Sequence, residues 1–582
     1  MGFVTVASGD IDGVPAFWQA EPGGASRPGT YTAGLVFRTG MADETLATRG
    51  VTHLLEHLAL YPLHVDAARH VNGQTGQLTT TFLTRGDAGE VAGFFKALCA
   101  SLRNLPGDRI EKEKQVLRIE ASERDSSILQ PLLRHRYGAE GYGLAGFPEL
   151  GLGAVDASGL EAWAARGFTR GNAALWITGG APPAGLRLDL PDGERSPAPD
   201  APVTIRSTPA YFNTNVAGPA FHGLVERSTA ATVYATVLSG ILTDELRYKQ
   251  ALTYTPEVSY TVRDGRYAHI LAMAAGTRES VSVLTAEFLR ILSRLRDQPA
   301  DADKVREVTE RLAAQWDNPD PAAAASLVRR AAQNELLGYQ SREPEERRRE
   351  LAALSPGDLH RVAEEAFANG AFALPRRQKS FIAGLPHIPW TRAEPVTGRD
   401  VPSADAPFVA IRLIVGAEGV SVRQGTQSLT VRFADCAALM VRPDGARRLI
   451  GLDALEVPVE PTMWRLKPDE ISRIDAAVPR DRHVRAPYRE PETIPRPGTP
   501  PWMRLAGRLA GNVYLAAAVT AVIVLGIPLL IGQFSPVAGF IAALCLALPL
   551  LTGLGARKTL RVLLWRAAAK RTEGVGDPPD TG

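Results

Sequence analysis

The stretch "RGVTHLLEHLALYP", Arg49 to Pro62, places two histidines and a glutamate within about one turn of a predicted helix. The apolar residues around them predict a buried helix face. That face accounts for the leucines, but not for His53, Glu56 and His57 together. Residues four apart share one side of a helix, so His53 and His57 can hold one metal ion between their imidazoles. Glu56 stands one residue before His57, where its carboxylate can reach a water on that metal without binding the metal.

The pattern H-x-x-E-H is the inverted form of the zinc-peptidase motif, which needs two imidazoles and one carboxylate base. A catalytic zinc also takes a third protein ligand and keeps an open position for water. The predicted helix "EKEKQVLRIEASE" offers a candidate, because Glu113 and Glu120 are seven residues apart and therefore point the same way. A solvated surface helix would account for either residue alone. The pair at this spacing, after the H-x-x-E-H helix, favours a metal site.

The composition of the chain indicates a multidomain protein in a reducing compartment. A chain of 582 residues is too long for one hydrophobic core, so several domains are expected. With 65 basic and 63 acidic residues, the charge balance gives no indication of a nucleic-acid partner. Three widely separated cysteines indicate a reducing compartment rather than a disulfide framework.

Periodicity and proline-rich stretches predict an α+β chain with several parts. Strand and helix patterns alternate in residues 1–190 and again in 203–372, which predicts two duplicated α/β lobes. Residues 400–484 contain short strands at regular spacing followed by a helical segment. We expect a small β-roll there, which resembles the pleckstrin-homology-like domains of bacterial membrane proteins. A Pro-rich tether, residues 485–508, follows.

Two apolar runs near the C-terminus, residues 512–532 and 536–555, contain no charged residue. Each can cross a bilayer core of about 30 Å as a helix, so a two-helix transmembrane hairpin is predicted over residues 509–556. A buried core hairpin is the alternative. Basic residues flank the hairpin on both sides, including the tail at 557–582. The positive-inside rule then predicts a multi-pass protein of the cell membrane, with both termini and the soluble domains in the cytoplasm.

The two predicted lobes resemble the pitrilysin/insulinase family of zinc metallopeptidases, which includes the mitochondrial processing peptidase. In this sequence the family's motif order corresponds to His53-Leu-Leu-Glu56-His57, then the strand "NGQTGQLTTTF", then Glu113 and Glu120. The resemblance implies a Zn2+ cofactor held by both histidines and Glu120, with Glu56 as the base. It also implies that Glu113 orients the site.

A second motif, "DELRYKQALTYT", resembles the family's "ELREKRGLAYS" in the second lobe. The matching residues, Arg247 and Tyr254, are implied to bind substrate and stabilise the transition state. Long family members fuse two pairs of lobes, whereas short ones pair two chains. This chain has one pair, so the resemblance implies a homodimer, or a heterodimer with a related chain, in which Arg247 and Tyr254 reach the metal of the other subunit.

The sequence departs from the family in two places. The spacer between His57 and Glu120 is shorter than usual, and the strand reads Asn72-Gly73-Gln74 where the family has Asn-Ala-aromatic. Both changes touch the rim of the expected substrate cleft, so known specificities are not carried over. A peptide is expected to add as an extra strand along Asn72, Gly73 and Gln74.

These observations predict a membrane-anchored zinc endopeptidase that hydrolyses extended or unfolded peptides at the cytoplasmic face. One alternative is a non-catalytic peptide-binding or assembly subunit of a membrane complex. Another makes the β-roll and the hairpin the functional core. In that reading Arg442, Arg447 and Arg448 would contact lipid, although loop arginines are more often merely solvated.

Overall fold

The computed structural model describes residues 6–19, 29–63, 70–123, 128–201, 207–317, 321–376, 385–388, 394–405 and 411–498. The chain divides into two compact units. The first comprises residues 1–390, 450–454 and 480–486, and the second comprises 391–449, 455–479 and 487–582. The predicted transmembrane hairpin and basic tail, residues 509–582, lie outside the described residues. Within the described ranges, no helix combines the length and apolar character needed to cross a membrane.

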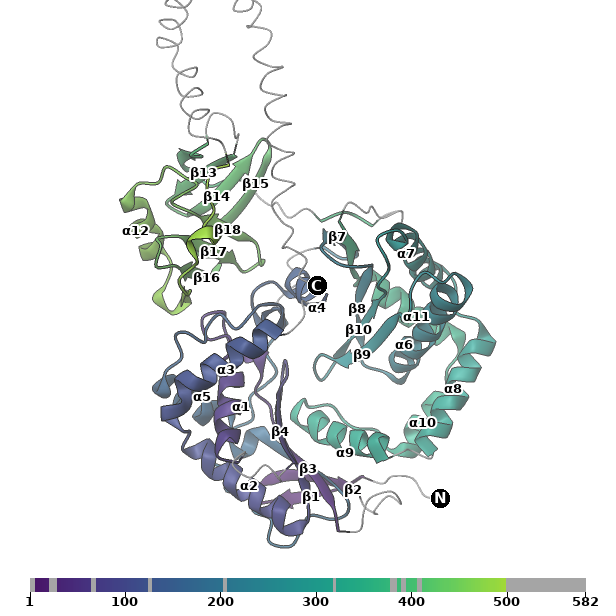
Figure 1. Cartoon of the computed structure of the whole chain (residues 1–582). Helices are drawn as coiled ribbons and strands as arrows, with labels where there is room; N and C mark the ends of the chain where they lie inside the picture. Colours follow the sequence, from purple (N-terminus) through teal and green to yellow (C-terminus); the bar gives the residue numbers. More distant parts are fainter. Residues whose placement is uncertain are drawn as a thin grey trace, which may run out of the picture. The chain divides into compact units, whose positions relative to one another are not determined.

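The first lobe of the first unit is a six-stranded sheet with helices packed against it (Figure 1). The strand order is β1-β2-β6-β3-β5-β4, so β4 is an edge strand. The strands are β1 (Val6–Ile11), β2 (Val14–Gln19), β3 (Tyr31–Phe37), β4 (His70–Thr75), β5 (Thr80–Gly86) and β6 (Ala173–Thr178). The helices are α1 (Val51–Leu60), α2 (Ala88–Arg103), α3 (Ile110–Glu123), α4 (Leu129–Tyr137) and α5 (Ala157–Gly167).

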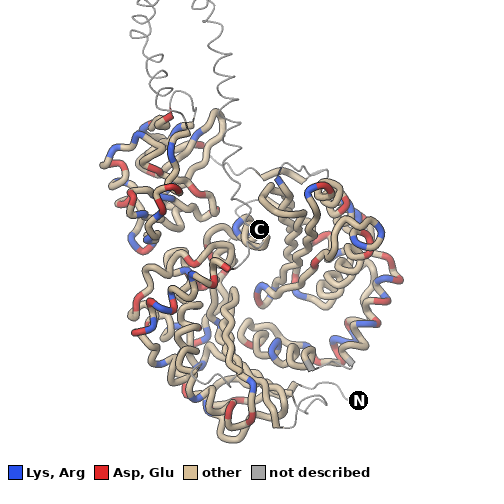
Figure 2. The backbone as a smooth tube through the Cα atoms, viewed as in Figure 1, with Lys and Arg blue, Asp and Glu red and all other residues tan. Residues whose placement is uncertain are grey.

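The second lobe is a five-stranded sheet with the order β7-β11-β8-β10-β9. Its strands are β7 (Ala210–Thr214), β8 (Ala220–Glu226), β9 (Glu257–Val262), β10 (Tyr267–Met273) and β11 (Ala371–Pro375). Its helices are α6 (Thr229–Leu242), α7 (Val281–Asp297), α8 (Ala302–Asp317), α9 (Pro321–Leu336), α10 (Pro344–Ala353) and α11 (Pro356–Ala368). Figure 2 shows Lys and Arg interspersed with Asp and Glu along these outer helices.

The two lobes share one topology, as the predicted duplication requires. In each, the last strand pairs in parallel with an early strand, β6 with β2 and β11 with β7. The remaining ladders then follow in the same antiparallel order, from β6 to β4 and from β11 to β9. The edge strands β4 and β9 therefore occupy equivalent places, and so do helices α1 and α6.

Apolar side chains on the inner helix faces build a separate core in each lobe. One helix of the second lobe also packs on the first. Val328, Ala332 and Leu336 of α9 lie against Val36 and Trp176 on the first lobe's sheet, and all five side chains are buried. This contact joins the two lobes through apolar surface.

The helix that follows β8 changes type before it ends. The α-helical part, α6, ends at Leu242, and a π-helical segment continues from Thr243 to Lys249. A π-helical turn carries an extra residue per hydrogen-bonded turn, so it changes the direction of the side chains that follow. Arg247 lies on this segment.

The second unit is rich in β-structure, as predicted for residues 400–484. One sheet has the order β12-β13-β14-β15, and strands β16, β17 and β18 belong to another. The strands are β12 (Gly398–Pro402), β13 (Ile411–Gly416), β14 (Gly419–Gln424), β15 (Gln427–Arg432), β16 (Cys436–Val441), β17 (Arg447–Gly451) and β18 (Glu456–Val459). One helix, α12 (Pro468–Ala477), contributes Ile474 to the core of this unit. A short strand, β19 (His483–Arg485), lies in the first unit.

Two of the three arginines considered for lipid contact are paired with carboxylates, whereas Arg442 donates to the Pro487 carbonyl at 3.4 Å. Arg447 forms a two-point ion pair with Asp475, at 2.7 and 2.8 Å. Arg448 pairs with Glu456 at 3.1 Å. Guanidinium groups held by carboxylates in this way carry little net charge to a lipid surface, so the lipid-binding alternative loses support.

Candidate metal centre

A buried carboxylate fixes the start of α1. Glu44 accepts backbone N–H groups from Gly50 and Thr52 at 3.0 Å each, and it pairs with the Arg49 guanidinium at 3.0 Å. Gly50 has a φ of 105°, where a Cβ atom would lie 2.8 Å from the Cβ of Glu149. Burial raises the pKa of Glu44, and the Arg49 charge opposes that effect. These contacts satisfy the helix N-terminus and set which face of α1 points outward.

His53 and His57 on α1 converge with Glu120 on α3. The Oε2 atom of Glu120 lies 3.7 Å from His53 Nε2 and 3.6 Å from His57 Nε2. One ligand atom from each residue lies within 4.8 Å of the others, so the group could hold a metal ion. Tetrahedral zinc, with bonds of about 2.0–2.2 Å, separates neighbouring ligand atoms by roughly 3.4 Å. The two distances to Glu120 exceed this spacing by only a few tenths of an ångström, and the donor types suit zinc.

The other ring nitrogen of each histidine faces a carboxylate. The Nδ1 atom of His53 lies 2.7 Å from Glu149 Oε1, and the Nδ1 atom of His57 lies 3.4 Å from Glu113 Oε2. Glu113 also accepts from Arg109 at 3.1 Å. An Nδ1–H that donates to a carboxylate leaves the lone pair on Nε2, which is the nitrogen turned toward Glu120.

Electrostatics around His53 follow from these partners. Burial by itself lowers the pKa of His53, but the Glu149 hydrogen bond and charge outweigh burial, and the pKa is raised overall. Glu56 and Glu120 add smaller effects in the same direction. A site with this much negative charge around its imidazoles favours a cation.

Glu56 lies beside the metal group without joining it. Its Oε2 atom accepts a hydrogen bond from Thr75 Oγ1 at 2.9 Å. A Cβ atom added at Gly73 would lie 2.3 Å from Oε1 of Glu56, so a larger residue there would require the Glu56 side chain to shift from this position. Burial raises the pKa of Glu56, against the opposing pull of His53, Thr75 and His57. A carboxylate with a raised pKa is suited to accept and return a proton near neutral pH.

The predicted substrate strand borders the same pocket. Asn72, Gly73 and Gln74 lie on β4, and they line a cavity of about 290 Å³ together with the metal group, Glu56 and Thr75. Among the strands of the described residues β4 pairs only with β5, so none of them covers its outer edge, and another strand can add there. The Asn72 amide oxygen accepts from the Gly73 N–H at 2.9 Å.

Arg247 and Tyr254 lie elsewhere. Both belong to the second lobe, and neither lines the metal pocket. The Arg247 guanidinium lies 4.7 Å from the ring centre of Tyr254 and 5.2 Å from that of Tyr248. Tyr254 exposes 82% of its surface and Tyr248 exposes 70%. The structure thus brings the metal group, Glu56, Glu113 and the β4 residues together, and it leaves this cation–π cluster on an exposed surface.

Sequence reasoning missed two members of the site. Glu149 follows a short 3₁₀ helix and precedes a turn, and Thr75 ends β4. The need for a carboxylate behind each metal-binding histidine predicts that such a residue exists, but no spacing rule indicates which of the many glutamates it is.

This chain resembles known proteins in its fold, whereas its sequence is only distantly similar to theirs. No protein-family model matches the sequence, and no curated protein matches it. Solved structures do match. A protease from Helicobacter pylori is 16% identical, with a TM-score of 0.53 over 64% of this chain and 100% of that chain. A peptidase M16 inactive domain from Pseudomonas fluorescens is 13% identical, with a TM-score of 0.53 over 65% and 99%. A chain of complex III2 from Candida albicans is 14% identical, with a TM-score of 0.51 over 63% and 95%.

The paired lobes have the M16 peptidase fold. This agrees with the pitrilysin-type fold that the motif order predicts. The matched structures include a protease and an inactive domain, so the M16 fold leaves catalysis to be argued from the residues of the site.

The carboxylate behind His53 gives a testable prediction. In Glu149→Gln the acceptor oxygen remains but its charge is lost, so zinc affinity should fall by about 10-fold or more. Titration against a chromophoric zinc chelator measures this affinity. Glu140→Gln, at an exposed glutamate earlier in the same segment, is the control and should bind zinc as the unmodified chain does. Equal affinity in the two variants would contradict the role assigned to Glu149.

Proposed function

We propose that this chain is a zinc-dependent endopeptidase that hydrolyses extended or unfolded peptides. One observation carries the proposal. Two imidazoles and Glu120 converge, each imidazole is backed by a carboxylate, and Glu56 stands beside them against an open strand edge. The M16 fold of the lobes supports the assignment.

The residues of the site divide the chemistry between them. Zinc, when bound by His53, His57 and Glu120, would act as a Lewis acid that lowers the pKa of water at the site. Glu56 accepts the proton of the attacking water and returns it to the leaving amine. The Thr75 hydrogen bond and the contact with Gly73 hold the Glu56 carboxylate in one position for both transfers.

The substrate pairs with the outer edge of β4. Backbone hydrogen bonds to a strand edge give affinity with little demand on side chains, which favours extended peptides over folded proteins. Pairing at Gly73 requires the Asn72 side chain to release the Gly73 N–H that it covers. This exchange replaces one hydrogen bond by another, so it adds little cost to binding.

A second chain completes the proposed site. Tyr254 is exposed, Arg247 beside it is half-buried, and both lie outside the metal pocket of their own chain, as expected of groups that act on a partner. A homodimer, or a pair with a related chain, would bring an arginine and a phenol to the scissile carbonyl. Complex III2, whose chain shares this fold, is by its name an assembly.

The second candidate function is a non-catalytic peptide-binding or assembly subunit of a membrane complex. The match to an inactive M16 domain favours it. That candidate keeps the open β4 edge but needs no proton transfer by Glu56. The metal and the cleavage reaction therefore have to be measured separately.

The test compares the full-length chain with Glu56→Gln. Both should bind about one zinc per chain, and only the unmodified chain should cleave a pool of unstructured peptides, followed by mass spectrometry. Loss of the general base should reduce cleavage by about 10²–10⁴-fold. Glu123→Gln, at the exposed end of α3, serves as the control. Zinc binding without cleavage by the unmodified chain, alone or paired, would favour the subunit function, and absence of zinc would refute the metal site.

A mixing experiment tests the partner chain. Arg247→Ala keeps the metal residues and Glu56→Gln keeps the arginine. Each alone should be nearly inactive, because loss of an oxyanion donor costs about 10²–10³-fold and loss of the general base costs about 10²–10⁴-fold. Random pairing of equal amounts gives half mixed dimers, each with one complete site, so activity should recover to about a quarter of the unmodified level. An Arg247→Ala chain that keeps full activity, or a mixture with exchanged subunits that stays inactive, would rule out action across a dimer.

The proposed location is the cell membrane, with the peptidase lobes in the cytoplasm, and it rests on the apolar runs after residue 511 and their basic flanks. Full-length protein should stay in the membrane pellet after an alkaline carbonate wash. A chain ending at residue 498 should be released to the supernatant. Release of both forms would argue against a membrane hairpin.

A further inference from the structure

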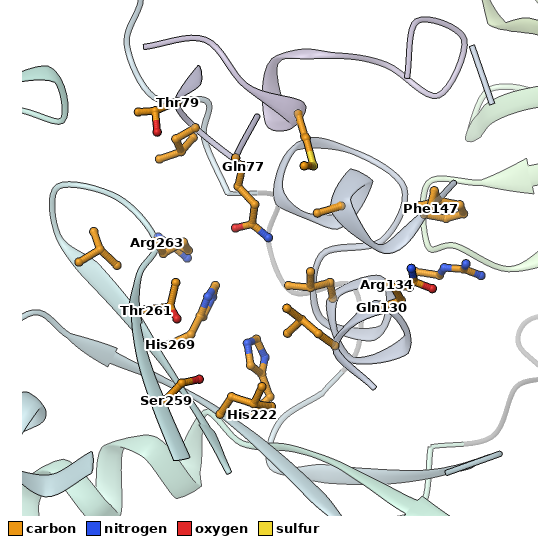
Figure 3. A pocket seen from close by; sticks show the side chains of 18 of the residues that line it. Gln77, Thr79, Gln130, Arg134, Phe147, His222, Ser259, Thr261, Arg263 and His269 are labelled. Carbon is orange, nitrogen blue, oxygen red and sulfur yellow. The ribbon is translucent and has the colours of Figure 1, made fainter. Parts of the chain in front are cut away.

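A second cavity, of about 810 Å³, lies within the first unit between elements of both lobes. Its walls come from the turn that joins β4 to β5, from α4, from β9 and β10, and from α9. Figure 3 shows Gln77 from that turn facing the rings of His222 and His269 on the strands of the second lobe. A volume of several hundred Å³ is the size range of small-molecule sites.

His222 presents an unsatisfied donor in this cavity. The residue is fully buried on β8, and the Arg136 Nε–H donates to its Nδ1 atom at 3.0 Å. Arginine cannot accept a hydrogen bond, so Nδ1 carries the lone pair and the proton of the neutral ring is on Nε2. Among the described residues, no group accepts from that buried Nε2–H. Burial, with His269 and Arg136 nearby, holds the pKa of His222 well below its usual value, so the ring is neutral.

The charge in the cavity wall is mostly positive. Among the described residues the wall has one carboxylate, Glu149, and four arginines: Arg49, Arg134, Arg263 and Arg330. Arg49 is paired with Glu44, and Arg263 is paired with Asp264. A wall with this charge balance favours an anion in the cavity.

Arg330 has no carboxylate of the described residues within 4.0 Å of its guanidinium, whereas Arg49 and Arg263 each have one. Its side chain is exposed and lines the cavity, so a ligand that enters from solvent can reach the guanidinium. Arg136 adds a second positive charge behind His222, and its acceptors are the His222 ring and two backbone carbonyls.

Part of the wall is apolar. Leu78, Leu133, Phe147 and Leu271 line it together with Leu337. We propose that this cavity binds a molecule with a carboxylate on an apolar body, the carboxylate accepting the Nε2–H of His222 and offsetting the charge of Arg330. The apolar side chains remove the body of the ligand from water, and the donor and the cation select for the acid.

The inference does not depend on the proposed peptidase activity. His222 and Arg330 are not metal ligands, and binding can be measured with the metal removed. Two sources could supply the ligand: the C-terminal carboxylate of an apolar peptide, or a free aliphatic acid. The probes are therefore acetyl-Leu-Ala-Phe as the free acid, the same tripeptide as the C-terminal amide, and octanoate.

Isothermal titration calorimetry tests the proposal with full-length protein in phosphatidylcholine nanodiscs and EDTA, and empty nanodiscs are the reference. At least one acid should bind saturably at one site per chain. Arg330→Gln should weaken it by about tenfold or more, as expected for the loss of a charged partner. Arg329→Gln, on the adjacent arginine, which is also exposed but does not line the cavity, should bind within about twofold of the unmodified chain.

Two further variants locate the site. Ser259→Trp places an indole in the cavity and should abolish binding. His222→Met removes the donor and should weaken binding at least as much as Arg330→Gln; if it fails to fold in a thermal melt, the other variants decide. Binding of the tripeptide acid alone identifies a peptide source, and binding of octanoate alone identifies a free acid. No saturable binding, equal binding of acid and amide, or no effect of Arg330→Gln or Ser259→Trp would overturn the proposal.

Discussion

The metal centre depends on two hydrogen-bonded pairs, Glu149 with His53 and Glu113 with His57. The backbone of α1 fixes the Cα positions of the two histidines, but it does not fix the orientation of either imidazole ring. The carboxylates bind the Nδ1 sides, and this turns both Nε2 atoms toward Glu120. Glu113 comes from α3 and Glu149 from a segment beyond α4, so three separate parts of the first lobe must pack together to form the site. Metal affinity and folding of this lobe are therefore linked.

The sequence could predict the site residues that lie on helices, because helix periodicity shows which of them share one face. His53, Glu56 and His57 share one turn, and Glu113 and Glu120 are two turns apart on another helix, so periodicity alone places each group on one helix face. That the two helices meet came from the resemblance to a family. Glu149 and Thr75 lie outside helices, where spacing says nothing about position. The ending of α6 was also hidden, because a π-helical segment and an α-helix have the same composition.

The strand sequence Asn72-Gly73-Gln74 differs from the family pattern, and the position of Glu56 in the structure bears on that difference. In the sequence, glycine at position 73 is only a change at the rim of the expected cleft. In the structure, a Cβ at this position would displace the carboxylate of Glu56 from where it lies. The edge strand and the proposed base are therefore in close approach at Gly73. Two residues further along the same strand, Thr75 donates to Glu56, so residues of β4 both make room for the carboxylate and hold it.

Glu149 connects the metal centre to the larger cavity, because it lines both. Its carboxylate holds His53, and Met41, the other residue common to both walls, accepts from Arg49 at 3.2 Å. Arg49 in turn pairs with Glu44, which satisfies the first N–H groups of α1. The wall of the cavity and the support of the metal helix are therefore the same set of side chains. Any ligand that shifts Glu149 changes metal affinity, and by thermodynamic linkage the metal changes the affinity for that ligand by the same factor.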